Sequence, residues 1–264
     1  MSKKFVSLVF IAFFVAVVAT YLSGDYESLV VQLWNLIPPL LAAVCGIFAV
    51  KIYNLNNPHA KAIALMALGV FFWFLGDFIW AIFEYFLNKS PFPSVADLFY
   101  LLAYPLLLIG LIIELRSNVL KFNLTKILLG TVIAIVLGII VVYFGVIKAY
   151  APEESLVNNA IAMAYGIGDL ILIIFGMAVL GVAIGYHKGK LFFPWISIVC
   201  GFCLILLADI LFAVYREEYE SFLGLFRNID LGWISGFLFI AFGFYSIGKT
   251  LKEAKNKLLK LAGG

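Results

Sequence analysis

Apolar segments of about 20 residues recur along the whole chain, and they limit its possible folds more than any other feature. A helix needs about 20 residues to cross the roughly 30 Å hydrocarbon core of a bilayer. Only 12% of the 264 residues are charged, about half the share that is usual in soluble domains. The sequence therefore predicts an all-α, polytopic transmembrane helical bundle with about eight spans, at 5–22, 31–53, 61–87, 95–115, 124–148, 156–186, 191–215 and 229–248.

The basic residues predict which side of the membrane each end occupies. With eight spans, the two ends and alternate loops carry 14 of the 18 lysine and arginine residues. Basic residues remain on the cytoplasmic side, so we expect a multi-pass protein of the cell (plasma) membrane with both termini in the cytoplasm. The alternative is a first span that is a signal peptide, cleaved near Val17 to Ala19, which would leave seven spans.

The second half of the chain repeats part of the first half. The similarity is clearest in spans three and four, which resemble spans seven and eight, and it fades in the first two spans of each half. Offsets of 132 and 133 residues align Gly69 with Gly201, Asp77 with Asp209, Asp97 with Asp230, and Gly110 with Gly243. We expect two tandem four-helix repeats in parallel orientation, at 1–123 and 124–248, followed by a basic cytoplasmic tail at 249–264.

Carboxyl groups inside the apolar spans are the strongest indication of a functional site. A charged group near the middle of a bilayer costs roughly 3 kcal/mol on insertion scales, so it usually faces the bundle interior and has a role. In the predicted topology, no lysine or arginine lies at a matching depth to neutralise these groups. We expect a cavity in the outer half of the bilayer that contains Asp77, Glu84, Asp97, Asp169, Asp209 and Asp230.

Aromatic residues share helix faces with these carboxyl groups. Trp73, Asp77, Trp80 and Glu84 follow one another at steps of three or four residues, which is the spacing of one helix face. Carboxylates beside aromatic rings suit a cation or a protonated amine, and protonated carboxyls that hydrogen-bond to tryptophan and tyrosine fit the pattern equally well. The predicted ligand-binding residues are Asp77, Asp169, Asp209, Glu84, Trp73, Trp80, Tyr104, Tyr165, Asp97 and Asp230.

Several of these residues also have a purely structural interpretation. Ser94 and Asp97 have the spacing of a capping box, and Asp230 can begin the last span in a similar way. Trp80 can belong to the aromatic belt at the membrane surface, and Glu84 can reach water. Helix-to-helix hydrogen bonding without a ligand is the alternative for Asp77, Asp169 and Asp209.

Patterns of catalytic or metal-binding residues do not occur in the sequence. Cys200 and Cys203 have C-x-x-C spacing, but His59 and His187 lie in predicted loops far from this pair along the chain. We interpret these two cysteines and Cys45 as small apolar packing residues. We therefore expect no enzyme activity, no cofactor, no metal and no nucleic-acid partner.

The stretch from Trp73 to Gly110 contains L-G-D-x-x-W-A and P-S-x-A-D-L-x-Y-L-x-x-Y-P-L-L-L-x-G, with related pieces at 207–213 and 230–233. This stretch resembles the multi-span sensor region that precedes bacterial diguanylate cyclases and some histidine kinases. The resemblance implies a membrane-embedded input module. The chain departs from that pattern because it ends at Gly264 without an output domain, so a signal would have to pass to a separate partner protein.

These observations lead us to expect a sensor or receptor-like module in the lipid bilayer that binds a small ligand, with a cation as the first candidate. Ligand binding would shift the two halves against each other and move the loops at 54–60 and 187–190 and the tail. Two alternatives remain open. The same carboxyl groups could serve a proton- or cation-coupled transporter, or the chain could be an accessory subunit of a membrane complex.

Overall fold

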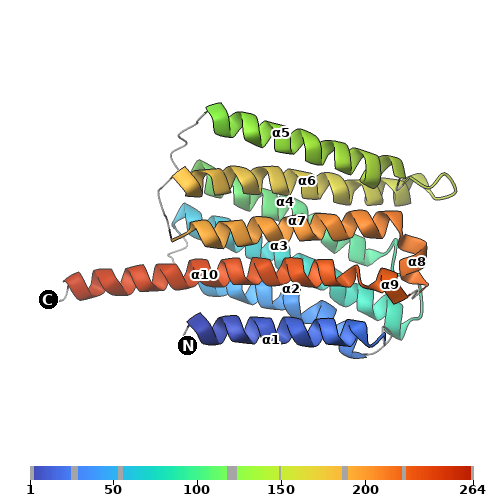
Figure 1. The fold of residues 1–264 in the computed structure, drawn as a ribbon, viewed down its shortest axis with the longest axis horizontal. Coiled ribbons are helices and arrows are strands. Elements are labelled where there is room, and N and C mark those ends of the chain that lie inside the picture. Colours follow the sequence, from blue (N-terminus) through green and yellow to red (C-terminus); the bar gives the residue numbers. More distant parts are fainter. Residues whose placement is uncertain are drawn as a thin grey trace.

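Apolar helices that run side by side make up the described part of the protein (Figure 1). The structure is a computed structural model, and it describes residues 3–24, 29–52, 56–117, 124–148, 150–185, 190–221 and 224–262. Two π-helical segments, η1 and η2, continue α3 and α5. The elements are α1 (Lys3–Leu22), α2 (Leu29–Val50), α3 (Pro58–Ala81), η1 (Ile82–Phe86), α4 (Val95–Arg116), α5 (Leu124–Ile140), η2 (Val141–Lys148), α6 (Leu156–Gly185), α7 (Phe192–Val214), α8 (Arg216–Glu220), α9 (Gly224–Arg227) and α10 (Asp230–Ala262).

The prediction of a helical membrane bundle is confirmed. Within the described residues, 7 helices are long and apolar enough to cross a membrane, and they begin within a few residues of the predicted spans. The first predicted span forms α1, which has 20 residues but is not among these 7 helices, so a count of eight spans remains a prediction. The predicted tail is not a separate element, because α10 continues through it without a break to Ala262.

Six helices form a closed ring. α2 packs against α3, α3 against α4, α4 against α6, α6 against α7, α7 against α10, and α10 packs against α2 again. α1 contacts α2 and α10, whereas α5 contacts α6, and these two helices lie at opposite edges of the bundle (Figure 1). Both chain ends lie at one end of the bundle, and α8 and α9 lie at the other (Figure 1).

Glycines allow neighbouring helices of the ring to approach closely, as small residues commonly do between membrane helices. In the pairs α3–α4 and α7–α10, a methyl group in place of the glycine hydrogen would overlap the neighbouring helix. The added carbon would lie 2.7 Å from Leu107 at Gly69, 2.6 Å from Met66 at Gly110, 2.7 Å from the Gly236 carbonyl oxygen at Gly201, and 2.5 Å from Ile198 at Gly243.

Large apolar side chains fill the ring at the end where the chain termini lie. Met66, Leu107, Ile198 and Phe244 are all inaccessible to solvent and belong to one continuous core. Trp73 belongs to the same core and contacts aromatic rings of three other helices, those of Tyr104, Phe202 and Phe237. This aromatic cluster closes the apolar core on the side that faces α8.

We predict that Gly201→Ala destabilises the protein, because the new methyl group would meet the backbone of α10 at Gly236. Overpacking of this kind costs about 1–3 kcal/mol, which unfolding of the purified protein in detergent would measure. Gly181→Ala on α6 is the matched control, since a methyl group there meets no atom within 4 Å. Equal stability of the two variants would contradict the close approach of α7 and α10.

Candidate functional site

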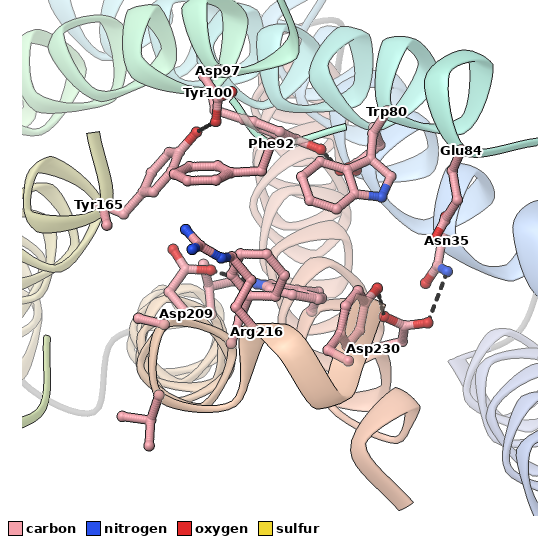
Figure 2. A pocket seen from close by; sticks show the side chains of 18 of the residues that line it. Asn35, Trp80, Glu84, Phe92, Asp97, Tyr100, Tyr165, Asp209, Arg216 and Asp230 are labelled. Atoms are coloured by element: carbon pink, nitrogen blue, oxygen red, sulfur yellow. Dashed lines mark hydrogen bonds between the residues drawn. The ribbon is translucent and has the colours of Figure 1, made fainter. Parts of the chain in front are cut away.

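A cavity of about 350 Å³ lies inside the helix ring, at the end that carries α8 (Figure 2). All six ring helices contribute side chains to its wall. The volume falls within the range of small-ligand pockets, about 300–1,000 Å³. The mouth is lined by residues of α8 and of the segment before α6, among them Glu153 and Glu217.

The cavity brings together nearly all the residues that the sequence indicated. Figure 2 shows Asp97 and Tyr100 on one side of it and Asp209 and Asp230 on the other. Asp169 is the exception, because it lies behind the wall next to Asp209. The predicted residues that line the cavity are Trp73, Asp77, Trp80, Glu84, Asp97, Tyr104, Tyr165, Asp209 and Asp230.

Asp77 and Asp209 are held by neutral donors from neighbouring helices. The hydroxyl of Tyr100 on α4 donates a hydrogen bond of 2.7 Å to Asp77 on α3. The indole Nε1 of Trp233 on α10 donates a hydrogen bond of 2.5 Å to Asp209 on α7. Both aspartates are partly exposed and line the cavity.

Glycine is needed beside Asp77 for this contact to form. A methyl group at Gly76 would lie 2.4 Å from the ring of Tyr100. The ring therefore lies directly against the backbone of α3, and its hydroxyl group reaches the carboxyl group of the next residue. The sequence L-G-D thus specifies both the packing of α4 on α3 and the donor for Asp77.

Asp97 lies in the first turn of α4 and also accepts a hydrogen bond from a tyrosine hydroxyl group of another helix. The Ser94 amide donates to its carboxylate over 2.6 Å, and the Ser94 hydroxyl accepts from Ala96, which completes the capping box predicted from the sequence. The hydroxyl of Tyr165 on α6 donates to the other oxygen of Asp97. The side chain is only 2% exposed, so Asp97 both caps α4 and joins α4 to α6.

Asp230 occupies the corresponding place at the start of α10 and is 1% exposed. Its carboxylate accepts hydrogen bonds from the Tyr21 hydroxyl at 2.7 Å and the Tyr219 hydroxyl at 2.6 Å. It also accepts one from the Asn35 amide at 3.1 Å (Figure 2). These donors belong to α1, α8 and α2. Asp230 therefore connects three further elements to α10.

Asp169 lies at the back of the cavity wall and is 2% exposed. It accepts a hydrogen bond of 2.9 Å from Tyr104, whose ring packs on the backbone of α6 at Gly168. Its carboxyl group is a direct neighbour of the Asp209 carboxyl group. Two adjacent carboxylates repel each other, so ionising one of these carboxyl groups makes ionising the other more costly.

The expectation that no basic residue would neutralise the buried acids is wrong for Glu84. Arg227, which the sequence placed in a loop, is fully buried and its Nη1 lies 2.8 Å from the Glu84 carboxylate. Its guanidinium group also lies over the ring of Tyr219 at 4.2 Å. The π-helical turn η1 carries Glu84, and α9 turns Arg227 into the bundle, so Glu84 is paired inside the protein.

An ion pair, a cation–π contact and a hydrogen bond also hold α8 across the mouth of the cavity. The Arg216 guanidinium lies 2.5 Å from the Glu154 carboxylate and over the ring of Phe92 at 4.9 Å. Ser90 donates a hydrogen bond of 3.1 Å to Glu220. Burial raises the pKa of the Glu220 carboxyl group above its usual value. α8 is therefore tied to the segments that precede α4 and α6.

Sequence reasoning missed several residues of the site, for different reasons. Tyr100 and Trp233 lie three residues after Asp97 and Asp230, so their position on the same helix face was a usable signal. Asn35 and Arg216 line the cavity as well, but neither follows a periodic pattern. Arg227 gave no signal, because its segment carries no regular apolar spacing.

Metal binding finds no support within the residues that the structure describes. There, no group of three or more histidine, cysteine, aspartate or glutamate residues has an arrangement that could hold a metal ion. Cys45, Cys200 and Cys203 are free thiols.

Comparison of the chain with protein-family models, with curated proteins and with solved structures finds no match.

We predict that Arg227→Met destabilises the protein by about 3–5 kcal/mol, because it leaves Glu84 and Asp230 as buried charges without their cation. Adding Glu84→Gln should recover part of this loss. Arg216→Met is the control, since the Arg216–Glu154 pair is 22% and 31% exposed and such pairs contribute about 0–1 kcal/mol. Unfolding in detergent measures all three, and similar losses for Arg227→Met and Arg216→Met would contradict the assignment.

Proposed function

We propose that the protein is a membrane-embedded, receptor-like module that binds a small organic cation inside its helix ring. The observation that carries this proposal is the cavity, whose wall combines aromatic rings with carboxyl groups. Aromatic faces and carboxylates both attract cations, and the attraction is stronger away from bulk water.

The charges around the cavity favour a cation over an anion. Asp77 and Asp209 accept hydrogen bonds from the neutral groups of Tyr100 and Trp233, which orient the carboxyl groups without supplying a positive charge. At the mouth, acidic residues outnumber Lys148 and Arg216. A positively charged ligand would therefore be attracted toward the mouth and neutralised within.

The proposal includes eight spans in two tandem four-helix repeats of parallel orientation, with both termini in the cytoplasm. Close contacts support the repeat, since Gly69 meets Leu107 as Gly201 meets Ile240, and the offsets of 132 and 133 residues relate these pairs. Tyr21 of α1 is 1% exposed, which supports α1 as an integral span. The cavity then opens to the outside.

A route for a signal is available in α10. This helix is 33 residues long, lines the cavity with Asp230, Trp233 and Phe237, and continues beyond the bundle at the opposite end (Figure 1). A ligand that displaces its first turns would move its basic end, where a partner protein can bind. Of the loop expected to move with it, residues 187–189 lie outside the described residues.

Transport is the second candidate, favoured by the position of the cavity between the proposed repeats, where transporters often hold their substrate. Cation or proton flux into liposomes that contain the protein would distinguish the two functions. Flux in the wild type that is lost in the Asp77→Asn, Asp209→Asn double variant would favour transport over reception.

We predict that small organic amines raise the melting temperature of the purified protein and that a variant without the cavity carboxyl groups, Asp77→Asn, Asp169→Asn, Asp209→Asn, loses most of this shift. A ligand at 100 times its Kd stabilises a protein by about 2.7 kcal/mol, which a thermal shift detects. Glu253→Gln is the control, because this exposed residue lies in the end of α10 outside the cavity. An amine panel without any effect on the wild type would refute the proposed function.

A further inference from the structure

The cavity has two opposite walls that are built alike. In the ring order α2, α3, α4, α6, α7, α10, α3 lies across from α7 and α4 across from α10. Rings of α3 and α7 meet across the interior, since Trp73 lies 6.4 Å from Phe202 and Trp80 lies 5.7 Å from Phe212. Asp77 lies between the two tryptophans along α3, and all three side chains line the cavity.

Each wall contains the same hydrogen-bonded unit. The first half-site comprises Asp77, Tyr100 and Asp97, and the second half-site comprises Asp209, Trp233 and Asp230. In both, an aromatic donor one turn after the buried aspartate donates a hydrogen bond to the partly exposed aspartate. The buried aspartates are bonded to the next helix of the ring, to Tyr165 on α6 and to Asn35 on α2.

The half-sites offer the same group to a ligand. At Asp77 the bound donor is a neutral hydroxyl group, and at Asp209 it is a neutral indole group. Each half-site therefore presents one carboxyl group to the cavity. A single ammonium group could pair with only one of these carboxyl groups, whereas a ligand with two ammonium groups could pair with both.

We infer that the ligand of this cavity is an organic diamine, with one ammonium group bound at Asp77 and the other at Asp209. This inference rests on the proposed function and names the ligand class. An ammonium group has three donors and can bind a carboxylate whose other oxygen already accepts from Tyr100 or Trp233. The carbon chain between the two ammonium groups would lie along the rings of Trp73 and Trp80.

The test compares linear diamines of increasing length with their mono-N-acetylated forms, which have one positive charge. Binding is measured by calorimetry on the full-length wild-type protein in nanodiscs. We expect each acetylation to weaken binding at least about tenfold, because two linked contacts reinforce each other. We also expect one best chain length, because the two carboxyl groups have a fixed separation.

Variants assign each end of the ligand. Asp77→Asn should weaken diamine binding at least about tenfold, so that the diamine binds no better than its acetylated form. The acetylated form should lose only about half its affinity, because it can still use the second half-site. The Asp169→Asn, Asp209→Asn double variant removes both adjacent carboxyl groups at the second half-site and should give the same pattern. Helix content and elution volume check that the variants fold.

Several outcomes would overturn the inference. Equal wild-type affinity for a diamine and its acetylated form, or no dependence on chain length, would exclude a two-ended site without requiring any variant. Complete loss of both ligands in Asp77→Asn would indicate a site for one cation. In each of these cases the proposed function stands, whereas failure of every amine to bind the wild type would refute the proposed function itself.

Discussion

Carboxyl groups inside the bundle must find hydrogen-bond donors on other helices, and the arrangement of the ring depends on this requirement. Tyr100 joins α4 to α3 through Asp77, Trp233 joins α10 to α7 through Asp209, and Tyr104 joins α4 to α6 through Asp169. Such bonds contribute only about 0.6 kcal/mol each in membranes. Their main effect is therefore on specificity, because a helix turned about its axis would leave a buried carboxyl group without a donor.

Packing and polarity divide the interior into two parts. Where Gly69, Gly110, Gly201 and Gly243 bring helices together, buried side chains that are mainly aliphatic pack inside the ring. Toward α8, the rings of Trp73 and Trp80 extend across the interior to α7. These large planar side chains leave space between them, and this space is the cavity. The cavity thus begins where aliphatic packing ends, and its polar groups are those that the hydrogen bonds between helices already hold.

The sequence predicts the spans well, because bilayer thickness requires a helix length that hydropathy reveals directly. It also predicts that Asp77 and Asp209 are equivalent, since one offset relates them. It could not predict the Arg227–Glu84 pair, which depends on a π-helical turn and on the one-turn helix α9. Trp80 shows a further limit. Spacing places it on the face of Asp77, but only packing against Phe212 decides that this face points inward and not toward lipid.

The departures from the repeat are concentrated at the mouth and behind one wall. The offset of 132 residues that aligns Asp77 with Asp209 also aligns Glu84 with Arg216, so opposite charges occupy equivalent positions. Glu84 pairs with Arg227 inside the bundle, whereas Arg216 pairs with Glu154 at the mouth. A duplicated interior provides two like carboxyl groups, whereas the mouth is asymmetric, because the Arg216–Glu154 pair is partly exposed and the Arg227–Glu84 pair is buried. Opening at the Arg216–Glu154 side would therefore expose the cavity without breaking the buried Arg227 cluster, which separates ligand access from the contacts that hold the ring.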